Sequence, residues 1–296
     1  MVVAPLQVPT GKVKQLSVAI PASVISDTPH LREKTAKLGA IARASSIFGV
    51  SNILLYDDAE RGHDNLEFCF EVLTYLETPQ YLRKKLFRLS PTLRFTGILP
   101  PLQTPPHNVS RTLSDLKVGD IREGLVVSKR DETLIVDAGL PETVTTRGAG
   151  AVGERVVVRL LSVGRTLRGE VERAVPIRDS AGEARYWGYK VRKTRSIDAL
   201  LQQEDADVKI GTSRYGSPVS DVWPSVKARL EKAGSILVVF GSPKEGLKEI
   251  LQHENLRAAD AFDYFINMVP NQHTATVRTE EALLISLGLL NFALAS

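Results

Sequence analysis

The sequence predicts an α/β protein whose parallel sheet is interrupted by a small, basic β-barrel. Toward both ends of the chain, apolar runs of strand length alternate with runs of helical periodicity, which is typical of a parallel sheet covered by helices on both faces. Between them lie five short valine-rich runs at roughly even spacing, which is typical of a small barrel. We therefore predict a sheet domain formed by residues 1–90 and 186–296, with residues 91–185 as an inserted barrel domain.

The N-terminal part supplies two strands and two helical segments. Residues 14–25 indicate a strand followed by a turn, and residues 31–50 place apolar side chains at helical spacing. Residues 51–58 form an apolar run that ends in two acids, which indicates a buried strand. Residues 64–87 are helical in pattern, with a break expected at Pro79.

The barrel segment opens with a proline cluster at residues 97–109, which we interpret as a stiff linker. The five predicted strands lie within residues 122–130, 132–140, 142–146, 153–163 and 167–175. Five strands with a basic surface match the OB-fold, which binds single-stranded nucleic acid through a charged groove and aromatic platforms. Aromatic residues are scarce within these runs, so we expect contacts to the nucleic-acid backbone or its shape rather than a ladder of stacked bases.

The positive charge of the chain is concentrated in the same segment. Residues 91–195 carry 18 Lys and Arg against 12 Asp and Glu, a net of +6, whereas the rest of the chain carries 20 against 22, a net of −2. Most of the 18 are arginine, whose planar guanidinium donates two hydrogen bonds to one phosphate. This division indicates a nucleic-acid partner, and a merely solvated basic surface is the alternative.

The C-terminal part continues the alternation of strands and helices. The predicted elements are a helix at 222–234 closed by Gly234, a strand at 235–241, a loop and helix at 242–254, a strand at 261–269 and an apolar helix at 278–294. Three polar or glycine-bearing loops follow strands here, within residues 209–219, 240–246 and 267–281. Because ligands of such sheets bind beyond the carboxyl ends of strands, we expect the three loops to form one pocket.

Bulk features and missing motifs exclude several classes of protein. The single cysteine, Cys69, rules out an internal disulfide framework and is interpreted as a buried thiol in a reducing compartment, which we expect to be the cytoplasm. The five histidines have no zinc-ligand spacing, so no metal is expected, and neither a secretory signal nor a membrane span is predicted. Neither a G-x-G-x-x-G after the strand that ends at Gly241 nor a G-x-x-x-x-G-K-[ST] anywhere occurs, which disfavours an ordinary nucleotide enzyme.

Three segments in order resemble the motifs of the SPOUT-class methyltransferases of TrmH-like type. "LGAIARASSIFGV" resembles the first motif, whose arginine matches Arg43, "ILVVFGSPKEGL" the second, and "NMVPNQHTATVRTEEALLISLGLL" the third. "LTYLETPQYLRKKLF", "GILPPLQTPPH", "WGYKV" and "TSRYG" resemble the archaeal and eukaryotic branch of RNA methyltransferases with an OB-like insertion. The first motif departs from the family at its usual asparagine, since Lys37 and Leu38 stand nearby.

The resemblance implies a trefoil knot, a homodimer and S-adenosylmethionine bound largely by backbone groups of loops 211–216, 240–246 and 267–276. The implied donor-binding residues are Thr212, Ser213, Phe240, Gly241, Ser242, Gly246, Asn267, Met268, Val269, Pro270, Gln272, Thr276 and Thr279. The candidate catalytic residues are Arg43, Arg214, Asn271 and Glu280. Arg43 and Arg214 would orient phosphate or stabilise charge, and no single general base is assigned.

Two functions remain open at this point. The first is a methyltransferase acting on structured RNA, for which the resembling branch favours uridine N3 in ribosomal RNA over a transfer-RNA target or the ribose 2′-hydroxyl. The second is a non-catalytic RNA-binding or ribosome-assembly factor that keeps the fold. Two structural alternatives also stay open, because Arg43 fits a surface position on a helix and Glu280 fits the acidic first turn that favours a helix dipole.

Overall fold

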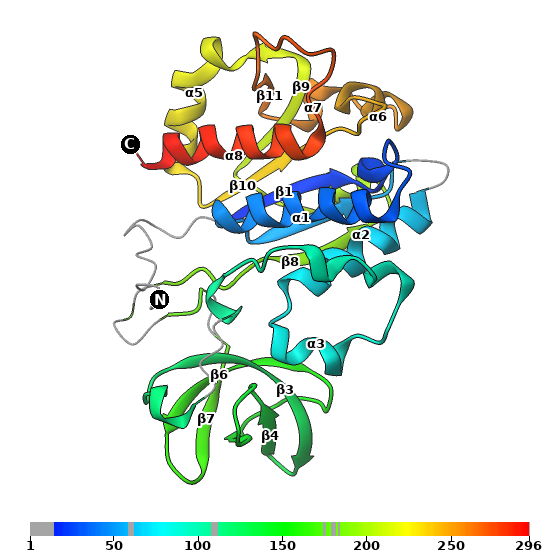
Figure 1. The fold of residues 1–296 in the computed structure, drawn as a ribbon. Coiled ribbons are helices and arrows are strands. Elements are labelled where there is room, and N and C mark those ends of the chain that lie inside the picture. The colour runs from blue at the N-terminus through cyan, green and yellow to red at the C-terminus, as the bar shows by residue number, and fades with distance from the viewer. Residues whose placement is uncertain are drawn as a thin grey trace. The chain divides into compact units, whose positions relative to one another are not determined.

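The computed structural model describes residues 15–58, 62–107, 112–173, 176–178, 182 and 184–295, which form two compact units (Figure 1). The sheet unit comprises the described residues up to Glu77 together with Ser90–Leu102 and those from Gly188 onward. The barrel unit comprises Thr78–Leu89 and the described residues of Gln103–Trp187. The chain therefore leaves the sheet unit at Thr78 and again at Gln103, and it returns at Ser90 and at Gly188.

A six-stranded parallel sheet forms the centre of the sheet unit. Its strands, in spatial order, are β11 (Tyr264–Asn267), β9 (Val208–Pro218), β10 (Ser235–Val239), β1 (Gln15–Pro21), β2 (Asn52–Tyr56) and β8 (Lys190–Thr194). Every pair is parallel, with Val18 opposite both Val238 and Ile53 at the centre of the sheet. The central strands of this parallel sheet are apolar on both faces, so both faces need to be covered by helices.

Helices cover the two faces through two separate hydrophobic clusters. The first face contacts α1 (Leu31–Ile47), α2 (Gly62–Glu77), α5 (Val219–Lys232) and α8 (Thr279–Ala295). The second face contacts α4 (Ile197–Gln203), α6 (Leu247–His253) and α7 (Ala258–Ala261). Successive residues of one strand belong to different clusters, as Val238 and Val239 do, because successive side chains of a strand point to opposite faces of the sheet. The shorter segments η1 (Ala22–Ile25), η2 (Pro91–Leu93) and η3 (Thr96–Ile98) complete the unit.

The barrel unit is a closed barrel of five strands. Around the barrel they follow as β3 (Ile121–Arg130), β4 (Thr133–Asp137), β5 (Val144–Arg147), β7 (Leu167–Glu172) and β6 (Arg155–Ser162), which pairs with β3 again. The interior holds aliphatic side chains such as Val126, Val136 and Val158, and all pairs are antiparallel except β5 with β7. The segments η4 (Pro105–His107) and η5 (Leu113–Asp115) precede the barrel.

Helix α3 (Gln80–Leu86) packs with the barrel rather than with the helix before it. Tyr81 donates a hydrogen bond to the Glu123 carbonyl at 2.8 Å, and its ring lies where a side chain on Gly139 would stand. Gly139 has a φ of +71°, which favours glycine, so both its conformation and its missing side chain serve this contact.

The structure confirms the mixed α/β class with a parallel sheet and a separate five-stranded barrel. The predicted helix break is also confirmed, since α2 ends at Glu77 and α3 begins at Gln80, and Cys69 is buried. Strand β8 and helix α4 had no prediction from the sequence. The predicted strand at 261–269 is wrong in extent, because α7 occupies its start and β11 only Tyr264–Asn267. No helix in the described part of the chain is long and apolar enough to span a membrane.

Candidate functional site

The carboxyl ends of β9, β10 and β11 lie side by side at one edge of the sheet. The order β11-β9-β10 is parallel throughout, so the segments that follow these strands leave from the same edge. Two of the predicted loops lie in the segments after β10 and β11, and the third lies within the carboxyl-terminal part of β9. The edge is therefore the candidate functional site, and its side chains fall into those that hold the loops together and those that remain available to a ligand.

The end of β10 is fixed by hydrogen bonds to its carbonyl and amide groups. Thr212 Oγ1 donates to the Val239 carbonyl at 3.0 Å, and the Phe240 amide donates to the Ala19 carbonyl at 2.9 Å. Tyr56, fully buried at the end of β2, donates its hydroxyl to the Phe240 carbonyl at 2.5 Å. Burial raises the pKa of Tyr56 well above its usual value, so the hydroxyl retains the proton that it donates.

Gly241 is required by the protein's own backbone. A Cβ at this position would stand 2.5 Å from the Leu247 amide nitrogen and 2.9 Å from the Gly246 carbonyl carbon. The resemblance implies that Gly241 binds the methyl donor, and in the structure the place of its missing side chain is taken by the loop that returns to α6. At Gly246 the nearest atom to an added Cβ would be Oε2 of Glu249, at 2.7 Å, which is the end of a flexible side chain.

The loop from residue 268 to residue 278 is held by its own polar groups and by Gly241. Asn267 accepts a hydrogen bond from the Val269 amide at 2.9 Å and donates to the Arg214 carbonyl at 3.1 Å. At the far end of the loop, Thr279 Oγ1 donates to the Gly241 carbonyl at 3.0 Å. These contacts tie the three strand ends to one another.

The predicted loop at 211–216 lies within β9 but leaves the regular ladder. Phe265 pairs with Gly211 and the next residue, Ile266, pairs with Ser217, so residues 212–216 bulge out of the pairing with β11. The backbone of β11 lies against Gly216, where a Cβ would stand 2.6 Å from the Ile266 carbonyl carbon. The prediction of a simple loop is therefore wrong, although a bulge at a strand end displays side chains in a similar way.

Arg214 extends from this bulge toward the loop that follows β11. Its Nη1 donates to the Ala275 carbonyl at 3.4 Å and its Nη2 to the Tyr215 hydroxyl at 2.6 Å. The guanidinium also lies 4.7 Å from the centroid of the Tyr215 ring, a cation–π distance. These contacts place Arg214 at the candidate site in an exposed position.

A buried lysine, at which the sequence departs from the family motif, joins α1 to the start of α8. Lys37 Nζ lies 2.7 Å from Asp27 Oδ1 and 3.5 Å from Glu280 Oε2, and its side chain is 5% exposed. Burial acts to raise the pKa of Asp27, but hydrogen bonds from Lys37 and Thr28 outweigh it and lower this pKa below 3.8. Glu280 therefore lies beside a cation at the edge of the site.

Arg43 lies farther along α1 and contacts a different segment. Its Nη1 donates to the Leu102 carbonyl at 2.7 Å, and none of the described residues of the three loops bonds to it. Six residues separate it from Lys37, which is about 9 Å along a helix. The first motif thus brings Lys37, and not Arg43, to the loops of the same chain.

The predicted site residues therefore divide into two groups. Thr212, Asn267 and Thr279 hold the strand ends, while Phe240 and Met268 are buried beside them. The Gln272 side chain donates to the Thr274 and Ala275 carbonyls, and the Thr276 carbonyl accepts from the Thr274 hydroxyl. The hydroxyls of Ser213 and Ser242 form hydrogen bonds within their own segments. Asn271 and Pro270 are exposed, and the Asn271 side chain has no hydrogen bond to the described residues. Sequence reasoning missed Tyr56, whose partner Phe240 is distant in the chain, and Asp27, whose ion pair with Lys37 has no sequence motif.

A second acid lies at the same edge, after β2. Asp58 accepts hydrogen bonds from both the amide and the hydroxyl of Ser23. Burial raises the pKa of Asp58, and those hydrogen bonds act in the opposite direction without cancelling it. Across the described residues, no three His, Cys, Asp or Glu side chains are arranged to hold a metal ion.

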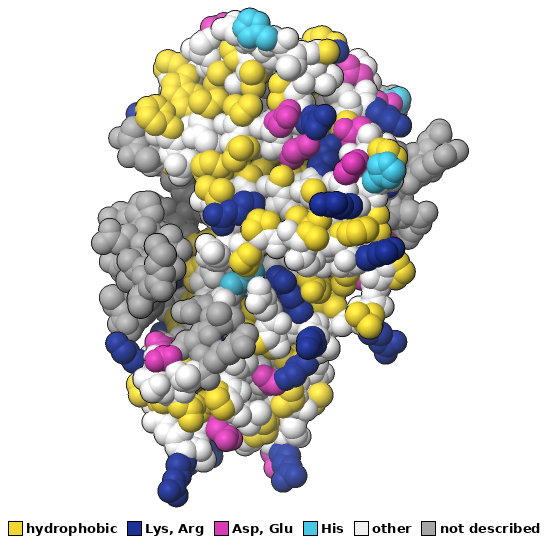
Figure 2. All heavy atoms as spheres, in the orientation of Figure 1, with side chains coloured by type: hydrophobic (Ala, Val, Ile, Leu, Met, Phe, Trp, Pro, Cys, Tyr) yellow, Lys and Arg dark blue, Asp and Glu magenta, His cyan; other side chains and the backbone are white. Residues whose placement is uncertain are grey.

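The cations of the barrel also divide into two groups. Arg155 pairs with Glu123 and Arg159 with Glu172 at 2.6 Å, while Arg122 is buried and reaches the Ala138 carbonyl. These arginines maintain the barrel. Others project into solvent, as the dark blue side chains of Figure 2 illustrate; the exposed ones on the strands and their turns are Lys129, Arg130, Arg147, Arg165, Arg168 and Arg173.

Comparisons with known proteins identify a family that spans both units of the chain. The family described as "Putative RNA methyltransferase" matches residues 15–290. A 28S rRNA (uridine-N(3))-methyltransferase of Mus musculus is 34% identical over 95% of this chain and 77% of its own length, and that of Homo sapiens is 33% identical over 95% and 78%. An uncharacterized protein of Haloarcula marismortui is 32% identical over 93% of this chain and 98% of its own length.

Proposed function

The chain belongs to this family of RNA methyltransferases, and we propose that it methylates N3 of a uridine in ribosomal RNA with S-adenosylmethionine as methyl donor. The observation that carries the proposal is the similarity to the mouse and human enzymes, which covers 95% of the chain. The family match, over residues 15–290, includes all three loops of the candidate site. Membership of the family favours the enzyme over the non-catalytic assembly factor that the sequence left open.

The residues at the edge of the sheet fit a nucleoside methyl donor. Backbone groups of three loops converge there, and the apolar side chains of Phe240, Met268 and Val269 lie beside hydroxyl and amide groups. Such a set suits a purine and its ribose, which need hydrogen bonds and an apolar face but no paired charge. When bound, S-adenosylmethionine supplies an activated methyl group. The chain contributes the positioning of the two reactants and the stabilisation of charge.

The candidate catalytic residues take different roles in this proposal. Arg214 is exposed beside the loop after β11 and would bind an RNA phosphate or the developing negative charge of the uracil. Asn271 would contact the base through its free amide, and Glu280, beside Lys37, would help receive the N3 proton. Arg43 faces away from its own loops, so we propose that it acts on the site of a second subunit.

A SPOUT-type knot and a homodimer belong to the same proposal. The dimer is supported by apolar side chains that stay exposed on α8, namely Leu284, Ile285 and Phe292, the last being 68% exposed, and hydrophobic side chains gather at the surface there (Figure 2). Ile47 at the end of α1 is 53% exposed and precedes Phe48, which packs against Gly288 of α8. An exposed apolar patch of this kind marks a protein interface.

We further propose that the barrel is an OB-like RNA-binding module. Its support is the order β3-β4-β5-β7-β6 with one parallel pair, together with exposed arginines on β3, β5 and β7. Phosphate contacts from such arginines bind RNA without reading its sequence. The choice of uridine would then depend on the sheet unit.

The test is methyl transfer to RNA followed by identification of the product. The chain is incubated with tritium-labelled S-adenosylmethionine and large-subunit ribosomal RNA from cells that lack the gene, and nucleosides are analysed by mass spectrometry. We expect label in N3-methyluridine. Label in a ribose-methylated nucleoside would replace the proposed target atom, and label in transfer RNA alone would replace the proposed RNA. Absence of label in any RNA would contradict the proposal.

A further inference from the structure

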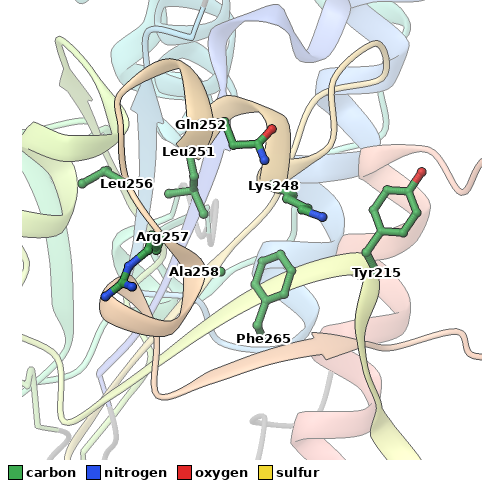
Figure 3. Close-up of a pocket in the computed structure, with 8 residues that line it drawn as sticks. All are labelled: Tyr215, Lys248, Leu251, Gln252, Leu256, Arg257, Ala258 and Phe265. Atoms are coloured by element: carbon green, nitrogen blue, oxygen red, sulfur yellow. The ribbon is translucent and has the colours of Figure 1, made fainter.

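A cavity of about 340 Å³ lies on the second face of the sheet, between β9, β11, α6 and α7 (Figure 3). We call it the α6 pocket. The eight side chains that line it all belong to the sheet unit, and none of them is a candidate donor-binding residue. The volume is at the lower end of the range for sites that bind small molecules.

The pocket has an apolar floor. Leu251 is buried, and Leu256, Ala258 and Phe265 are half-buried. The Phe265 ring is supported by the nearly parallel ring of Phe262, with 6.1 Å between centroids. A flat apolar floor with a fixed aromatic ring suits a planar ligand, because stacking requires a surface that does not move.

The rim is polar and carries positive charge. Tyr215, Lys248, Gln252 and Arg257 are all exposed, and no carboxylate lines the pocket. Lys248 extends toward Tyr215, with Nζ 5.7 Å from the ring centroid, as Figure 3 shows. Arg257 pairs with Asp260, whereas no described carboxylate pairs with Lys248. The rim therefore favours a ligand that brings its own negative charge.

The pocket adjoins the candidate site through two of its loops. Tyr215 follows Arg214 in the bulge of β9, and the two side chains are hydrogen-bonded. Lys248 follows Leu247, whose amide packs against Gly241. A polymer with one unit at the strand ends would thus meet the pocket with a neighbouring unit.

We propose that the α6 pocket binds one nucleotide of the RNA substrate, next to the nucleotide that is methylated. The base stacks on the floor at Phe265 and against Tyr215, and the phosphate contacts Lys248. This assignment rests on the proposed function, because it requires RNA at the candidate site. S-adenosylmethionine is the less suitable ligand, since it carries a sulfonium and an ammonium group and the rim offers cations without a carboxylate.

The experiment is photocrosslinking of the full chain to a short single-stranded oligouridylate that contains 5-iodouridine, with peptides identified by mass spectrometry. We expect a crosslink to Phe265 or Tyr215 that persists with excess S-adenosylmethionine. Phe265→Leu keeps an apolar floor without the ring and should reduce the crosslink to Tyr215 about tenfold, the scale of losing one stacked base. Lys248→Gln, at an exposed position that does not affect folding, should reduce the crosslinks to both residues severalfold and lower the salt slope of binding by about 0.7.

The control is Lys232→Gln, which removes the same charge from the exposed end of α5 and should leave the crosslink unchanged. Crosslinks at neither ring, or a crosslink to Tyr215 that Phe265→Leu and Lys248→Gln both leave unchanged, would overturn the proposal. Loss of the crosslink in the presence of S-adenosylmethionine would also overturn the proposal, and would indicate that the α6 pocket binds S-adenosylmethionine. Methyl transfer is measured on the same samples, so a crosslinked but inactive chain contradicts the proposed function and leaves the pocket in place.

Discussion

Replacing Gly241 by alanine tests whether the loop between β10 and α6 is fixed by backbone packing. The new Cβ would stand 2.5 Å from the Leu247 amide nitrogen, and ordinary contact begins at 3.4 Å, so the start of α6 must move by about 0.9 Å. Its other near neighbours, the carbonyl carbon and the Cα of Gly246, are also backbone atoms. No side chain can therefore rotate away to relieve the clash.

Overpacking of this kind costs ~1–3 kcal/mol of folding free energy. For domains of this size each kcal/mol lowers the melting temperature by ~2–4 °C, so we expect a decrease of ~2–12 °C. The same movement shifts the Gly241 carbonyl, which accepts the hydrogen bond from Thr279. Affinity for S-adenosylmethionine should therefore fall together with stability.

The melting temperature is measured by circular dichroism, and the affinity for S-adenosylmethionine is measured by calorimetric titration. Gly97→Ala is the matched control, because a Cβ at that position in the same unit meets no atom within 4 Å. Gly246→Ala is a second control for the melting temperature alone, since only the flexible carboxylate of Glu249 must move. If Gly241→Ala and the unaltered chain had the same melting temperature, the packing argument would be refuted. An equal loss of stability in Gly97→Ala would also refute it.

Four further predictions concern other parts of the molecule. Arg214→Ala and Arg43→Ala should each reduce methyl transfer by ~10²-fold, with donor affinity falling more for Arg214, and full activity of Arg43→Ala would exclude its catalytic role. Asp27 has a lowered pKa in the folded state, so its stabilisation is present above pH 3.8 and is lost as the pH falls through the lowered value; Asp27→Asn should weaken the acid dependence of the melting temperature, and an unchanged dependence would contradict this. Phe292→Asp should convert the dimer into a monomer in light scattering, whereas Lys232→Asp at the exposed end of α5 should not. Arg130→Gln with Arg147→Gln should reduce the salt slope of RNA binding by about 1.4 without changing the melting temperature, and an unchanged slope would exclude the barrel arginines.

The order of strands and helices could be predicted because periodicity is a local property of the chain. Short valine-containing runs separated by Gly and Asp predicted the five barrel strands, and Pro79 predicted the break between α2 and α3. Strand β8 was not predicted, because Lys190–Thr194 is mostly polar and more than half of its residues are exposed. Its place in the sheet depends on pairing with β2, a partner more than a hundred residues away, and no local pattern reports such a pairing.

The site could be predicted as three neighbouring loops but not as a set of contacts. Thr212 and Thr279 lie at the strand ends, and in the structure their hydroxyls bind the carbonyls of Val239 and Gly241. A hydroxyl after a strand has the same appearance in the sequence whether it binds a ligand or a carbonyl. Gly241 illustrates the same limit, since a missing side chain leaves room equally for a ligand and for another part of the backbone.

The position of Lys37 explains how α1 can affect the loops after β10 and β11, although α1 is not adjacent to them in the sequence. Helix α1 is packed against α8 along the first face of the sheet, and the Lys37 ammonium holds the acid at the start of α8. The residue before that acid, Thr279, is bonded to Gly241, so the position of α1 is transmitted to the end of β10 through two polar contacts. A buried cation is costly to leave without partners, and Lys37 has two carboxylates beside it, Asp27 at 2.7 Å and Glu280 at 3.5 Å. In the proposed reaction, where Glu280 receives a proton, Asp27 would still neutralise Lys37.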